Sequence, residues 1–145
     1  MENKGLFLPS TFVCIFNKDF SKILLIKRNQ QKREKYGIHW ANIGGKVEFG
    51  ELSIDACIRE ANEEAGLKLN KSDLKLVLVK ETPRPSITGI IYHFFYVINL
   101  PETIKITLNE ESDEYAWFDI NKLPEKMPND NIPEIIRLAK AKQTL

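Results

Sequence analysis

The feature that most limits the folds open to this chain is a change of hydrophobic period at Ser53. Before it, Thr11–Phe16 and Lys22–Lys27 are β-branched and aliphatic runs around a polar turn, which predicts an antiparallel pair of strands. From Ser53 to Ala65 the apolar residues recur at helical spacing, with Ser53 as the expected N-cap and Gly66 as the expected end. A chain that combines these patterns must bury one face of a helix against a sheet.

The rest of the chain adds more strands than helices. We expect strands at 74–80, 89–100 and 115–120, a charged loop at 28–37, and a second, closing helix at 132–142. This order favours an α/β fold with a mixed sheet covered by helices over a doubly wound parallel sheet. At 145 residues the chain suits one hydrophobic core, so residues 1–145 are expected to form a single domain.

Composition excludes several classes of protein. With 21 basic and 20 acidic residues, the formal charge of +1 gives no broad basic surface, so we expect no nucleic-acid polymer as a partner. No stretch is apolar enough for a membrane span, and the N-terminus lacks the pattern of a secretory signal, so we expect a cytoplasmic protein. Cys14 and Cys57 lie in apolar patterns and are expected to be buried free thiols.

Three carboxylates stand out on the predicted helix. Glu60, Glu63 and Glu64 are three and four residues apart, so they project from one face, roughly opposite the apolar stripe. Taken alone, they fit a solvated acidic face, which is the usual role of clustered charges. A divalent cation would instead convert their mutual repulsion into binding energy.

The spacing of the surrounding residues decides between these two interpretations. Counting from Gly45, five residues lead to Glu51, and seven more lead to Arg59-Glu60, followed by Glu63-Glu64 and Gly66. This resembles the signature of the Nudix hydrolase superfamily, in its MutT-like form. Ala61 is smaller than the aliphatic residue usual at its position, and Ile43 stands where many members have proline. The segments from Trp40 and from Ser112 also resemble the family, which implies an α/β/α sandwich.

The resemblance implies a role for each matching residue. Glu60, Glu63 and Glu64, with the carbonyl oxygen of Gly44, would bind Mg²⁺, with Mn²⁺ as an alternative. A rigid fork between Arg59 and Glu51 would hold a loop against the helix. The expected catalytic set is Glu51, Arg59, Glu63 and Glu64.

The general base that activates water is less narrowly defined by the resemblance. In this family it is either a glutamate of the signature or one from a later loop. We favour Glu64, and the eligible later residues are Glu110, Glu111 and Glu114, for which plain surface charge is the competing interpretation.

Candidates for substrate binding lie around the same segment. Lys46 and Arg28 would offset phosphate charge, although each is also compatible with an ordinary surface position. Four aromatic residues are candidates for stacking on a base, although aromatics at strand spacing more often form core: Tyr36, Trp40, Tyr92 and Phe95. Of these we favour Tyr92. Asn131 is expected either to contact a purine edge or to cap the closing helix.

Together these patterns predict a magnesium-dependent hydrolase of nucleotide phosphoanhydride bonds, converting (deoxy)nucleoside triphosphates to monophosphate and pyrophosphate. ADP-ribose or sugar-nucleotide hydrolysis is the alternative, because Pro83 lies near the position of a proline typical of that branch. A non-catalytic nucleotide-binding module is disfavoured by the intact acidic set. The expected partner is a small nucleotide, and a homodimer is left open.

Overall fold

The computed structural model describes residues 5–127 and 131–143. The elements along the chain are β1 (Leu6–Phe16), β2 (Lys22–Arg28), α1 (Gln30–Tyr36), β3 (Trp40–Ala41), β4 (Ile43–Lys46), α2 (Ser53–Ala65), η1 (Lys71–Asp73), β5 (Lys75–Arg84), η2 (Pro85–Ile87), β6 (Gly89–Asn99), β7 (Ser112–Asp119) and α3 (Asn131–Gln143).

The strands form one mixed sheet around the long strand β1. The main order is β3-β2-β1-β6-β5, with β4 also paired to β1 and β7 to β2. The pair β1–β6 is parallel along its whole length, from Leu6 opposite Gly89 to Phe16 opposite Asn99, and the other pairs are antiparallel. The predicted mixed sheet is therefore confirmed, and every predicted strand is present, with ends shifted by at most five residues.

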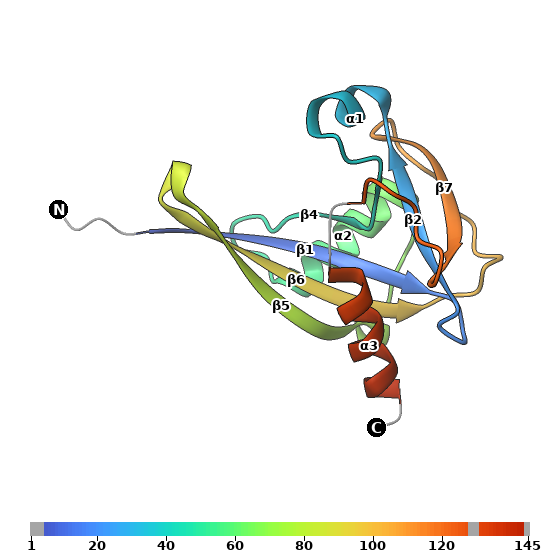
Figure 1. The fold of residues 1–145 in the computed structure, drawn as a ribbon. Coiled ribbons are helices and arrows are strands. Elements are labelled where there is room, and N and C mark those ends of the chain that lie inside the picture. Colours follow the sequence, from blue (N-terminus) through green and yellow to red (C-terminus); the bar gives the residue numbers. More distant parts are fainter. Residues whose placement is uncertain (1–4, 128–130, 144–145) are drawn as a thin grey trace.

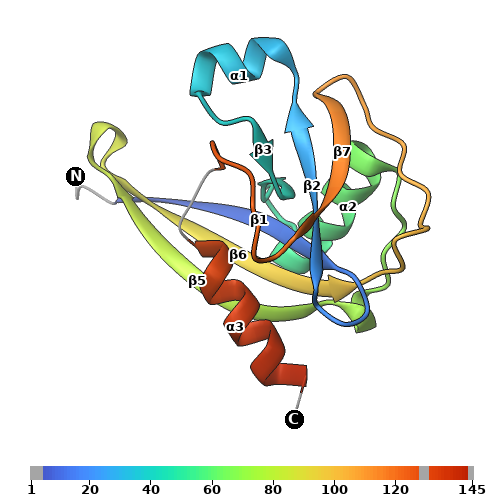
Figure 2. The same ribbon diagram turned by 45° about the vertical axis from the view of Figure 1, so that its right-hand side comes forward.

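Alternation along the central strands creates two separate apolar layers. Successive strand side chains point to opposite faces of a sheet. One face packs on α2 through Leu24, Ile26, Tyr96, Ile98, Cys57, Ala61 and Ala65. The other packs on α3 through Ile23, Leu25, Phe95, Val97, Ile132, Ile135 and Ala139. Figures 1 and 2 show α3 in front of the sheet and α2 behind it, which confirms the expected α/β/α sandwich.

The sheet splits where β1 and β2 diverge, and this split positions the site. The two strands pair only at Ile15 with Leu24 and Phe16 with Ile23. Farther along, β3 pairs with β2 and β4 pairs with β1, so the chain crosses from one strand to the other at Asn42. A polar residue thus lies between two strands that would otherwise be neighbours.

The segment 28–37 was predicted to be a loop, but it contains the helix α1. The described residues therefore contain three α-helices, not two. Asn29 caps α1 by accepting a hydrogen bond from Lys32 N, and Gly37 ends it in the left-handed region. No residue of α1 is buried, so the segment carries no apolar period that would have revealed a helix.

One local prediction at α2 also needs correction. The helix has the predicted bounds and ends at Gly66, but its N-cap is Leu52, because Ser53 is already helical and its hydroxyl contacts Tyr96 Oη at 2.6 Å. The two glycines Gly44 and Gly45 lie inside β4, close to β1 and to the Glu60 carboxylate.

Both cysteines are buried and free, as predicted. Burial raises the pKa of each thiol, that of Cys57 to about 12, so neither is activated as a nucleophile. None of the helices in the described ranges has the length and apolar character needed to traverse a lipid bilayer.

Candidate functional site

Helix α2 presents the three glutamates at different depths. Glu64 is 9% exposed, and its Oε2 accepts a hydrogen bond from the backbone N–H of Gly44 at 2.9 Å. The Glu60 side chain is 14% exposed and that of Glu63 is 53% exposed. Because β4 lies against the same end of the helix, the Glu60 carboxylate rests on Gly45, where a Cβ would come within 2.5 Å of Glu60 Oε1. A side chain at this position would therefore displace the Glu60 carboxylate.

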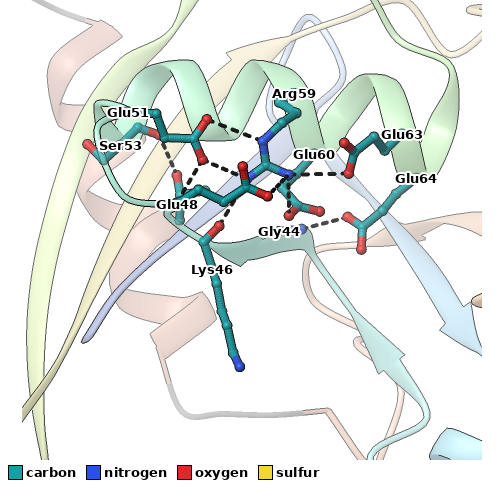
Figure 3. A network of polar contacts seen from close by, with 10 residues as sticks. Gly44, Lys46, Glu48, Glu51, Ser53, Arg59, Glu60, Glu63 and Glu64 are labelled. Carbon is teal, nitrogen blue, oxygen red and sulfur yellow. Dashed lines mark hydrogen bonds and ion pairs between the residues drawn. The ribbon is translucent and has the colours of Figure 1, made fainter.

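Arg59 ties the loop before α2 to the helix, as Figure 3 shows. Its Nε and Nη2 donate to the two carboxylate oxygens of Glu51 at 3.2 and 2.7 Å, which is the bidentate pair expected from the sequence. Nη2 also donates to the Lys46 carbonyl at 3.0 Å. Nη1 reaches Glu60 Oε1 at 3.0 Å and Glu63 Oε2 at 3.3 Å. One guanidinium thus organises both the loop and two of the three carboxylates.

The environment shifts the protonation of these carboxylates in opposite directions. Burial, and then the nearby Glu60 charge, raise the pKa of Glu64 to about 8. Burial also raises the pKa of Glu60, despite the opposing effect of Arg59. Hydrogen bonds from Arg59 lower the pKa of Glu51. The site therefore holds a charged, rigid Glu51 beside two acids that are costly to ionise unless a cation approaches.

The donor set suits a hard divalent cation, because carboxylate oxygens are the ligands that Mg²⁺ and Mn²⁺ prefer. Within residues 5–127 and 131–143, however, no three potential metal-ligating side chains already converge on one point. Glu60 and Glu63 are turned toward Arg59 Nη1, whereas Glu64 is turned toward Gly44. Binding a cation would require these carboxylates to turn toward one another, and Glu60 and Glu63 each accept from Arg59 Nη1 through only one oxygen.

A polar cavity of about 90 Å³ opens beside Glu64 at the split in the sheet. It is lined by Phe12, Ile26, Arg28, Lys32, Ala41, Asn42, Gly44, Glu64, Glu111 and Ser112. Of the predicted phosphate-binding residues, Arg28 therefore lies at the cavity. Lys46 contributes its backbone carbonyl to Arg59, and its side chain extends away from the carboxylates (Figure 3).

The three later glutamates that were candidates for the general base lie in different surroundings. Glu111 lines the cavity with Glu64, and its carboxylate pairs with Lys32 Nζ at 3.0 Å. Glu114 projects from β7 and pairs with Lys27 at 3.6 Å. Glu110 contributes its carbonyl oxygen to Asn29 Nδ2 and does not line this cavity. Among the eligible loop acids, only Glu111 joins Glu64 there.

Other candidates fall outside this cavity. Tyr92 packs against Phe7 with ring centroids 5.8 Å apart, on the three-stranded arm made by the free ends of β1, β5 and β6 (Figure 1). Pro83 lies in the same arm, opposite Ile90. The backbone of Asn131 begins α3, but its side chain lies outside the described part of the chain.

Sequence reasoning gave no site role to three polar residues that line the cavity, Lys32, Asn42 and Ser112. Lys32 was hidden in the segment expected to be a loop. If α1 had been recognised from the cap residue Asn29 and from Gly37, Lys32 would have been placed one turn beyond Arg28. Asn42 carried a weaker signal, a polar residue inside an otherwise apolar strand pattern.

Comparisons with known proteins agree with this geometry. The chain is 30% identical over 129 residues to mRNA-decapping enzyme subunit 2 of Saccharomyces cerevisiae; the match covers 86% of this chain but only 12% of that protein. It is 32% identical over 110 residues to the ADP-ribose pyrophosphatase of Methanocaldococcus jannaschii, covering 76% of this chain and 61% of that one.

A solved structure shows the same fold. The MutT NUDIX hydrolase of Burkholderia pseudomallei superposes with a TM-score of 0.73 at 21% identity, covering 92% of this chain and 98% of the other. The sequence model of the NUDIX domain matches residues 6–138, a span that contains α2, its carboxylates and the cavity. The chain therefore belongs to the NUDIX domain family, the superfamily that the residues from Gly45 to Gly66 resemble.

Proposed function

We propose that this protein is a divalent-metal-dependent hydrolase that cleaves a phosphoanhydride bond in a nucleotide. One observation carries the proposal: the buried Glu64, held by the Gly44 N–H, borders a cavity that also contains Arg28 and Lys32. Acidic groups for a metal and basic groups for phosphate oxygens thus lie side by side. A solvated acidic face would not require a carboxylate that is 9% exposed.

Each residue then has a definite task. A bound Mg²⁺ would supply charge neutralisation of the phosphates and a more acidic water. Glu60, Glu63 and Glu64 would hold the cation, and Arg59 with Glu51 keeps α2 in register with the loop at 46–51. Arg28 and Lys32 would bind non-bridging phosphate oxygens.

Glu64 is our choice for the group that takes a proton from the attacking water. Its carboxylate borders the cavity beside Arg28 and Lys32, where the phosphates and the attacking water would lie. Glu111 is the second candidate, because it faces the same cavity.

For the substrate we propose (deoxy)nucleoside triphosphates, cleaved to monophosphate and pyrophosphate. The two cations at the cavity suit phosphate groups, and Phe12 in its lining suits the edge of a base. ADP-ribose is the second candidate, favoured by the relative from Methanocaldococcus jannaschii. Pro83, which motivated that alternative, lies in the arm and does not line the cavity.

A substrate panel tests the proposal. Purified protein with Mg²⁺ is incubated with nucleoside triphosphates, ADP-ribose, sugar nucleotides and dinucleoside polyphosphates, and the products are identified by chromatography. Release of monophosphate and pyrophosphate from triphosphates is the expected result. Turnover of ADP-ribose alone would move the assignment to the second candidate, and turnover of nothing in the panel would favour a binding module.

A further inference from the structure

Asn42 is buried without a complete set of hydrogen bonds. Among the described residues, two buried side-chain polar atoms have no partner, Asn42 Oδ1 and Trp117 Nε1. Of these two residues, Asn42 is the one that lines the cavity beside Glu64, and it is 8% exposed. An amide oxygen removed from water without a replacement partner destabilises the folded protein. Such a group is explained if a ligand supplies the missing donor.

The surroundings of Asn42 identify the chemistry of that ligand. Asn42 lies between β3 and β4, two residues after Trp40 and two before Gly44. Trp40 contacts Phe118 edge-on, with ring centroids 4.8 Å apart. Phe12, which is paired with Gly44, stacks on Phe95 with ring centroids 5.2 Å apart. Of these aromatic residues, Phe12 lines the cavity together with Asn42.

The lining of the cavity combines charged and apolar side chains. Arg28, Lys32, Glu64 and Glu111 are charged, and Phe12, Ile26 and Ala41 are apolar. Phosphate groups would contact the cations, whereas an acceptor oxygen such as Asn42 Oδ1 would repel phosphate oxygens. A flat apolar group that carries an N–H donor suits both Asn42 and Phe12.

We propose that Asn42 is a specificity-determining residue whose Oδ1 accepts a hydrogen bond from an N–H group on the nucleobase of the substrate. This rests on the proposed function, because it takes the substrate to be a nucleotide. The cavity volume of about 90 Å³ is that of roughly three water molecules, so the cavity admits the edge of a base and leaves the ribose outside.

Binding of nucleoside monophosphates tests this inference without relying on turnover. The affinities of the four common monophosphates are measured by calorimetry with Mg²⁺, together with an analogue of the preferred base that lacks the N–H donor. For a purine, purine riboside 5′-monophosphate is that analogue. Wild-type protein should bind its preferred nucleotide about tenfold more tightly than the analogue, the scale of a good base contact.

Two substitutions remove the acceptor, Asn42→Leu with similar volume and Asn42→Ala in case leucine does not fit. In either variant the preference for the natural base over the analogue should fall to about threefold or less. Removing the acceptor from the protein and removing the donor from the base abolish the same hydrogen bond, so the two effects are not additive. Asn42→Leu should also raise the melting temperature, since the unpaired polar atom is gone. Asn99→Leu is the matched control, because Asn99 lies at the far end of β6 and outside this cavity.

The outcomes separate this inference from the proposed function. An unchanged base profile in Asn42→Leu and Asn42→Ala, or wild-type protein without base preference, would overturn the role of Asn42. If these variants hydrolyse triphosphates and keep the base preference of wild-type protein, only the inference about Asn42 fails. If wild-type protein hydrolyses nothing yet binds monophosphates, the proposed function fails, and the binding data still decide the role of Asn42.

Discussion

The buried carboxyl of Glu64 makes stability depend on pH in a direction that is unusual for a glutamate. Its pKa rises from 4.5 to about 8 on folding, mainly through burial. A carboxyl group with a raised pKa favours the folded state while it is protonated. Its contribution is complete below pH 4.5 and is lost as the pH rises toward 8. The difference between these two pKa values corresponds to a contribution of at most about 5 kcal/mol to the free energy of unfolding.

Glu64→Gln isolates this contribution. Glutamine keeps the acceptor for the Gly44 N–H but cannot ionise. In chelator, the free energy of unfolding of wild-type protein should fall relative to the variant by several kcal/mol, on the order of 3, between pH 5 and pH 8. Urea denaturation at each pH provides the measurement.

Two comparisons make this test decisive. Glu63→Gln, on a side chain that is 53% exposed, is the matched control and should parallel the wild-type curve. Excess Mg²⁺ should restore the stability of wild-type protein at pH 8 more than that of Glu64→Gln, because the cation binds the folded carboxylate. Parallel pH curves for wild-type protein and Glu64→Gln would refute the reasoning.

Four further substitutions test the surrounding geometry. Arg59→Lys should lower turnover at least about tenfold while the melting temperature changes little. The reason is that lysine cannot donate two hydrogen bonds to the Glu51 carboxylate at once. Wild-type turnover in this variant would contradict the role of Arg59. Gly44→Ala should destabilise the protein by about 1–3 kcal/mol, because its Cβ would collide with the backbone carbonyl oxygen of Thr11 on β1, and unchanged thermal unfolding would exclude that contact. Arg28→Ala should raise KM about tenfold, because Arg28 lines the cavity. Lys46→Ala should change KM less, because the Lys46 side chain extends away from the carboxylates. Equal changes of KM in the two variants would contradict a phosphate site at Arg28.

Sequence patterns predicted the elements that bury an apolar face. The α2 bounds and the strands followed from residues such as Cys57 and Ala61, whose spacing reflects packing against the sheet. Helix α1 was missed for the converse reason, since it buries no residue and depends on caps at Asn29 and Gly37.

The site was predicted unevenly for a related physical reason. Helix geometry placed the three glutamates on one face of α2, and the resemblance to the Nudix signature supplied the pair of Glu51 with Arg59. The meeting of Glu111, Lys32 and Asn42 beside Glu64 depends on how β1 and β2 diverge, a long-range property that local periodicity does not contain.

The most direct test of the central claim is the dependence of nucleotide hydrolysis on metal and on the acids of α2. Initial rates of triphosphate cleavage are measured during Mg²⁺ titration for wild-type protein, Glu63→Gln, Glu64→Gln and the control Glu114→Gln, whose side chain pairs with Lys27 on the sheet. We expect wild-type protein and Glu114→Gln to saturate with Mg²⁺ and to lose activity in excess chelator. Glu63→Gln and Glu64→Gln should be slower by about a hundredfold or more at every concentration. Full turnover in chelator, or wild-type rates in Glu64→Gln, would contradict a metal-dependent site on α2.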